Sequence, residues 1–184
     1  MQRGLFIIFG LTLVVSLLVT TGCNNVNQEP EPGRDGNVSP TTGKSAFNMI
    51  FKYGVMAVNE LNTFEGTYTK DMVSDPSITV ELTLSQEEKG RIYQKMLEID
   101  FFNYPEEFSV SVPEGEVIGM VTPYLSYYFK VEYNSQTKEL RWKDNITKPD
   151  EKADKLRELI TLIRDIVESK EEYKKLPEPT LAYL

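Results

Sequence analysis

The sequence contains no histidine, and it has a single cysteine, Cys23, among its 184 residues. Catalytic triads and general bases that use an imidazole are therefore excluded, as are histidine-ligated metal sites. A disulfide within the chain would need a second cysteine, so the core itself has to hold the fold together. The glycine-rich stretch "PGRDG" (32–36) has no predicted strand before it, unlike a phosphate-binding loop. We expect no cofactor and no metal site.

Basic residues are also few, with 20 Lys and Arg against 28 Asp and Glu, which gives a formal net charge of −8. A surface of this sign repels the phosphates of nucleic acids and of anionic lipid head groups. We therefore expect no nucleic-acid partner. Attachment to a membrane would need something other than surface charge.

An uncharged apolar run, "LFIIFGLTLVVSLLV" (5–19), follows Arg3 near the start of the chain. As a helix the run would cover about 22 Å, at 1.5 Å per residue, whereas the hydrocarbon core of a bilayer is roughly 30 Å thick. The short run and its basic flank are typical of a signal peptide rather than of a permanent span. Residues 1–22 are therefore predicted to be an export signal.

Directly after the run stands "TTGC" (20–23), which resembles the lipobox of bacterial lipoproteins, usually Leu-(Ala/Ser/Thr)-(Gly/Ala)-Cys. Thr20 departs from the usual Leu or Val of that motif. The resemblance implies that the Cys23 thiol is diacylglycerylated and that the chain is cut before it. Lipid on Cys23 would then hold the protein at the extracytoplasmic face of the cell membrane. The alternative is an uncleaved anchor with an incidental cysteine.

Residues 24–45 have three prolines, three glycines and no aromatic residue. Such a stretch buries too little apolar surface to offset the entropy of ordering it. We expect a flexible tether over 23–45, with a mean span near 25 Å. A single globular domain over 46–184 is expected to follow it.

Three strands are predicted in the first part of this domain, with Gly54 and Gly66 as turns or bulges. In the third strand, apolar residues alternate with polar ones, which is the period of a strand with one buried face. The first segment also fits a helix over 47–61. The predicted strands are "FNMIFKYGVMAV" (47–58), "TFEGTYTKDMV" (63–73) and "SITVELTL" (77–84).

Two amphipathic helices are predicted. The first begins after Ser85, which forms a capping box with Glu88, and ends near Asp100. The second begins at Pro149. The apolar stripe of the first comprises Ile92, Met96 and Ile99 with Tyr93 and Leu97, and that of the second comprises Ala153, Leu156, Leu159, Ile160, Ile163, Ile166 and Val167. Residues 171–184 are expected to be an irregular wrap or a loose end.

A hairpin is predicted from "SYYFKVEY" (126–133) and "KELRWKD" (138–144). A turn at Ser135-Gln136 would set like charges opposite each other, so we expect a register that opposes Glu132 to Arg141 or Lys130 to Glu139. The order of elements predicts an α+β fold, with an antiparallel sheet and two main helices packed on one face.

The strings "FEGTYTKDMV", "LTLSQEEKGRIYQKMLEIDFFNYP" and "YYFKVEY", together with the last helix, resemble a group of small Gram-positive lipoproteins that carry an α+β domain. The similarity covers about residues 47–180. The resemblance implies a lipoprotein location and an α+β architecture. It implies no activity and no ligand.

The segment 104–124 is long for a connection in a compact domain, and long loops are often functional. Its alternating apolar residues and the turn sequence "VPEG" (112–115) favour a hairpin within the segment. Exposed aromatic side chains here would be efficient contact residues, and the alternative is that the rings complete the core. The candidate interaction residues are Tyr104, Phe108, Tyr124 and Tyr128.

These observations favour a lipid-anchored binding module with a protein or cell-wall component as its partner. One alternative is an envelope hydrolase that uses paired carboxylates at Glu106/Glu107, Glu114/Glu116 or Asp71/Asp75. Another is a structural or inhibitory lipoprotein that pairs through a sheet edge. Weak calcium binding also stays open, although "KDMVSD" and "PEGE" lack the usual loop pattern. We expect no enzyme.

Overall fold

The computed structural model describes residues 47–183. The predicted signal peptide, the lipidation of Cys23 and the tether lie outside these residues. Within them, one seven-stranded sheet has the order β4-β3-β2-β1-β6-β7-β5. The strands are β1 (Asn48–Tyr53), β2 (Asn59–Asn62), β3 (Thr67–Met72), β4 (Asp75–Glu81), β5 (Glu107–Phe108), β6 (Met120–Tyr133) and β7 (Gln136–Ile146).

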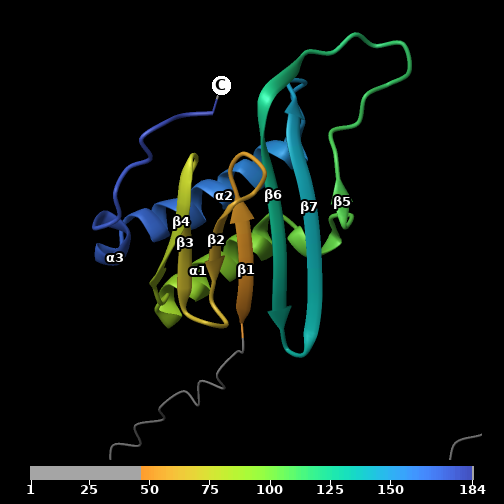
Figure 1. The fold of residues 1–184 in the computed structure, drawn as a ribbon. Helices are drawn as coiled ribbons and strands as arrows, with labels where there is room; N and C mark the ends of the chain where they lie inside the picture. The colour runs from red at the N-terminus through yellow and green to blue at the C-terminus, as the bar shows by residue number, and fades with distance from the viewer. Residues whose placement is uncertain (1–46, 184) are drawn as a thin grey trace, which may run out of the picture. The chain divides into compact units, whose positions relative to one another are not determined.

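Two main helices, α1 (Gln86–Glu98) and α2 (Glu151–Glu168), pack against one face of the sheet (Figure 1). A short 3₁₀ helix, η1 (Phe101–Asn103), and a one-turn helix, α3 (Glu171–Lys174), complete the described elements. The predicted α+β fold is confirmed. The sheet departs from a purely antiparallel one only at its edge, where β5 pairs parallel to β7.

The hairpin of β6 and β7 has one of the two predicted registers, with Lys130 opposite Glu139. Its turn residues are Asn134 and Ser135, and both have positive φ, at 48° and 64°. This is the backbone of the two-residue turn that suits the twist of a hairpin. The register sets unlike charges opposite each other on the open face of the sheet.

The first helix begins where the sequence predicts, whereas the second begins at Glu151, two residues after the predicted Pro149. Ser85 and Glu88 form a complete capping box at α1, and Asp150 caps α2 by accepting a hydrogen bond from the Ala153 amide. All seven apolar residues predicted for the stripe of α2 are buried. On α1 the prediction is wrong for Leu97, which is 47 % exposed, because the buried stripe follows Ile92, Met96 and Ile99.

The first predicted strand is shorter than expected, and the helical alternative for 47–61 is wrong. The chain leaves β1 at Gly54, whose φ is +101°, and turns into β2. An added Cβ at Gly54 would lie 2.8 Å from Asn59 Nδ2, so this turn needs a glycine. Met56 and Ala57 in the same turn also have positive φ, at 59° and 55°, which is strained for residues other than glycine.

The predicted hairpin within 104–124 does not form. Its first half, β5, pairs instead with the distant strand β7, setting Glu107 beside Arg141 and Phe108 beside Trp142. The turn lies one residue later than predicted, because the Glu116 amide donates to the Pro113 carbonyl at 3.2 Å. The chain then returns to the sheet as β6.

The C-terminal segment wraps around the β3–β4 end of the sheet, as one of the two predictions for it proposed. Lys70, on the helix-covered face of β3, lies 3.0 Å from Glu178 and 5.1 Å from the Tyr173 ring centroid. Further along, the Tyr183 hydroxyl donates to Asp71 at 2.7 Å. Leu176 is buried between these contacts.

Candidate functional site

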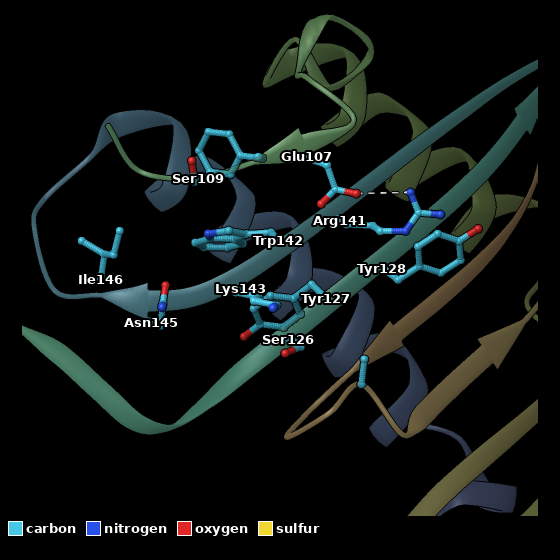
Figure 2. Close-up of a pocket in the computed structure, with 12 residues that line it drawn as sticks. Glu107, Ser109, Ser126, Tyr127, Tyr128, Arg141, Trp142, Lys143, Asn145 and Ile146 are labelled. Carbon is cyan, nitrogen blue, oxygen red and sulfur yellow. Dashed lines mark hydrogen bonds and ion pairs between the residues drawn. The ribbon is translucent and has the colours of Figure 1, made fainter. Parts of the chain in front are cut away.

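A cavity of the described domain lies along β7, and we call it the β7 groove. Its volume is about 620 Å³. It is bounded by β5 and the residue after it, by β6 and β7, and by the turn between β1 and β2, which contributes Ala57 (Figure 2). A cavity of this size is in the range of small-molecule and peptide sites.

Aromatic packing supports one wall of the groove. The Phe108 ring meets the Trp142 ring edge to face, with centroids 5.6 Å apart and an interplanar angle of 66°. Tyr127 also packs against Trp142, with ring centroids 5.3 Å apart. These three rings are at most 8 % exposed. They form a rigid apolar border, because edge-to-face pairs have a preferred geometry.

The basic side chains of the groove, Arg141 and Lys143, differ in their partners. Arg141 lies 2.8 Å from Glu106, 3.4 Å from Glu107 and 2.8 Å from Glu139. The hydrogen bond to Glu106 is the main reason that the pKa of the guanidinium is raised. Figure 2 shows Glu107 reaching toward Arg141, with Tyr128 beside the guanidinium.

Lys143 is exposed, and it forms no ion pair with any residue in 47–183. It borders both the β7 groove and a neighbouring cavity of about 430 Å³, as does Ser126. The neighbouring cavity is lined by Val55, Met56 and Tyr124. An uncompensated cation therefore lies between two largely apolar hollows.

The rim around these two cavities is apolar and exposed. Met56 is 72 % exposed, Met120 is 67 % exposed and Leu125 is 43 % exposed. An isolated exposed apolar residue needs no explanation, whereas a group beside a cavity marks a candidate contact surface. The strained turn at Met56 and Ala57 belongs to the same rim, and strained backbone often accompanies function.

The four predicted interaction residues occupy different places. Phe108 and Tyr128 both line the β7 groove, and Tyr124 lines the neighbouring cavity. Tyr104 lines neither cavity. Phe108 contributes only through a nearly buried ring, which is 8 % exposed.

Tyr104 belongs to the core, which corrects its assignment as an exposed contact residue. It is 4 % exposed, and its hydroxyl donates to the Lys152 carbonyl at 3.0 Å. Burial raises the pKa of Tyr104 to about 12, and the nearby Asp150 carboxylate adds to the shift. The ring meets Phe108 at 5.3 Å, so it supports the wall of the groove from behind.

Most of the predicted acids form contacts with other groups, and only Glu107 among them lines one of the described cavities. Glu116 binds Lys148 at 2.6 Å, and Asp75 accepts a hydrogen bond from Thr180 at 3.3 Å. Among the lining residues of the β7 groove, Glu107 is the acid, and it pairs with Arg141. Two facing carboxylates, which glycoside hydrolysis needs, are therefore not found in the β7 groove.

Within 47–183, no three Asp or Glu side chains converge to a potential metal site. The same residues include no helix with the length and hydropathy required to cross a membrane.

The sequence reasoning missed the residues that give the groove its charge, Arg141 and Lys143. A signal for them existed, because the predicted hairpin sets Tyr128, Arg141 and Lys143 on one face of the sheet. The sequence did not indicate that β5 pairs with β7. This pairing makes the open face of the hairpin one side of a cavity.

Comparison with family models, curated proteins and solved structures finds no match to this chain, so its own geometry has to carry the argument for function.

Proposed function

We propose that this protein is an extracytoplasmic, membrane-anchored binding module that takes up a ligand in the β7 groove. The groove itself carries the proposal: a cavity of about 620 Å³ has a rigid aromatic wall and a cation, Lys143, without an ion-pair partner in 47–183. A few polar groups set in a mostly apolar cavity are the usual composition of a ligand site.

The chemistry of the lining indicates the kind of ligand. An apolar group would lie against Tyr128 and Ile146, which line the groove and are partly exposed, and an anionic group would lie near Lys143. Arg141 is held by three carboxylates and would contribute shape more than net charge. The expected ligand is therefore an amphipathic molecule with one negative group.

The groove lies at the opposite end of β1 from the start of the described domain. At one end of β1, Asn48 pairs with Glu132, whereas beyond the other end Val55 bridges to Leu125. The groove includes Ser126, next to that second end, while the chain enters the domain at the first. The anchor itself rests on the likeness of "TTGC" to a lipobox.

The groove is tested with 8-anilinonaphthalene-1-sulfonate, an apolar dye with one negative charge. Trp142 is the single tryptophan of the sequence and borders the groove, so quenching of its fluorescence reports binding. Lys143→Glu should weaken dye binding about threefold to tenfold, as expected for loss of a charged contact. Lys175→Glu makes the same charge change outside the groove and should bind the dye as the wild type does. Equal dye binding by all three proteins would overturn the assignment.

The anchor is tested separately by Cys23→Ala. We expect this variant to be released from the membrane or to stay unprocessed. If the variant is cut to its mature form and still sediments with membranes as the wild type does, the anchor is contradicted and the groove proposal stays intact.

A further inference from the structure

The outer edge at β4 is the exposed edge of the sheet, opposite the edge that β5 partly covers. β4 pairs with β3 alone. Its sequence "SITVE" (77–81) is rich in β-branched residues and carries a single charge. Unpaired edge strands of this kind are templates for pairing with another chain.

The hydrogen bonds of β3 and β4 establish which backbone groups of β4 face outward. Thr67 is paired with Glu81, and the Leu82 amide donates to the Gly66 carbonyl at 2.7 Å. Because the direction of backbone groups alternates along a strand, Val80 also faces β3, and the groups of Ser77, Thr79 and Glu81 face outward. Within 47–183, no backbone hydrogen bond from a segment outside the strands reaches these three residues.

We propose that the β4 edge pairs antiparallel with the β4 edge of a second copy of this chain, with Thr79 opposite Thr79 of the partner subunit. In this register Ser77 lies opposite Glu81 of the partner subunit, twice by symmetry. The outward groups of Ser77, Thr79 and Glu81 then form about six backbone hydrogen bonds. The contact is isologous and closes as a dimer.

Charge and the length of β4 favour this register. A register centred on Val80 would set Ser77 opposite Thr83 of the partner subunit, beyond the end of β4 at Glu81. A register centred on Glu81 would oppose two glutamates, and one centred on Ile78 would set Asp75 opposite Glu81; both are unfavourable. Centring on Thr79 sets no like charges opposite each other.

The side chains of β4 suit the same pairing. Ile78 and Val80 are partly buried and pack against the core on the helix-covered face. In the proposed register Ile78 lies opposite Val80 of the partner subunit, so the two apolar cores continue across the interface. On the open face, Thr79 already bonds Thr69 at 2.8 Å. The C-terminal segment contacts β4 at its first residue, Asp75, through Thr180.

The test uses the full-length chain in its native membrane with single cysteine substitutions. Paired residues of an antiparallel sheet lie about 5.5 Å apart between Cα atoms, which is within disulfide range. Thr79→Cys should therefore give a crosslinked dimer under mild oxidation. Thr83→Cys is the matched control, because the two copies of residue 83 would lie about 26 Å apart, at 3.3 Å per residue. The wild type measures any background from Cys23.

The proposal fails if Thr79→Cys stays monomeric, or if Thr83→Cys crosslinks to the same extent. Two further variants, made in the Thr79→Cys background, test the register. Ser77→Lys sets a lysine opposite Glu81 of the partner subunit and should raise the crosslinked fraction, whereas Ser77→Glu should lower it. A change in the same direction for both would overturn the register. The dye and anchor experiments are independent of these outcomes.

Discussion

Arg157 on α2 donates two hydrogen bonds to the carboxylate of Asp144 on β7, from Nε at 2.9 Å and from Nη2 at 2.6 Å. The same guanidinium lies 5.2 Å from the ring centroid of Trp142. One side chain thus joins the helix layer to the strand that borders the groove. The hydrogen bonds to Asp144 are the main cause of the raised pKa of Arg157.

Arg157→Lys should lower the free energy of unfolding by about 1–2 kcal/mol, because lysine lacks the planar fork that binds a carboxylate through two hydrogen bonds. Urea denaturation followed by far-UV circular dichroism measures the change. Arg91→Lys is the control, since Arg91 is exposed and forms no ion pair within 47–183. Equal stability of the two variants would show that the Asp144 contact contributes nothing measurable.

Phe108→Ala should cost about 3 kcal/mol or more, because it leaves a cavity between Tyr104 and Trp142. Tyr128→Ala removes a partly exposed ring of the same groove and should cost less than about 1.5 kcal/mol. Thermal and urea unfolding of both variants test the contrast. Similar losses would mean that Phe108 is not part of the core.

Ser85→Ala should destabilise the domain by about 1 kcal/mol, since it removes the side-chain cap of α1. The Ser85 hydroxyl accepts from the Glu88 amide at 3.2 Å, and the Ser85 amide donates to Glu88 at 2.7 Å. Ser111→Ala, in the exposed connection before β6, should be neutral. A neutral Ser85→Ala would indicate that α1 is held by packing alone.

The stability of the domain should decrease in alkaline solution. Burial raises the pKa of Tyr104, Tyr127 and Tyr173 to about 12, against about 10 in an unfolded chain. The unfolded state therefore loses these protons first, so stability is fully present below pH 10 and falls as the pH rises from about 10 to 12.

Since the sequence has no histidine, we expect little change in unfolding free energy between pH 6 and 8. Urea denaturation across the pH range, with tyrosinate absorbance at 295 nm as the probe of ionisation, tests both statements. A steep change near neutral pH would contradict this account.

Local patterns predicted the parts of the fold that local physics determines. The stripe of α2 from Ala153 to Val167 and the capping box at Ser85 follow from helical spacing and cap chemistry, which act within a few residues. The avoidance of like charges limited the hairpin to two registers, and the structure has the one that pairs Lys130 with Glu139.

The groove could not be predicted in the same way. Phe108 pairs with Trp142, which is 34 residues further along the chain, and no local pattern around "EEF" (106–108) specifies a parallel partner. The alternation of Phe108, Val110 and Val112 favoured a nearby hairpin instead. Contacts between distant residues determined which aromatic rings were buried, and so Tyr104 belongs to the core while Tyr128 borders the cavity.

The two-residue strand β5 has a consequence for how the chain would tolerate breakage. Phe108 pairs with Trp142 of β7, and Met120 is the next residue that pairs with the sheet. Both ends of the connection 109–119 are therefore held by separate strand pairings. A protease cut near Gly115 would therefore yield two fragments that stay assembled and migrate as one species until denatured. The same position would accept new termini in a circularly permuted chain.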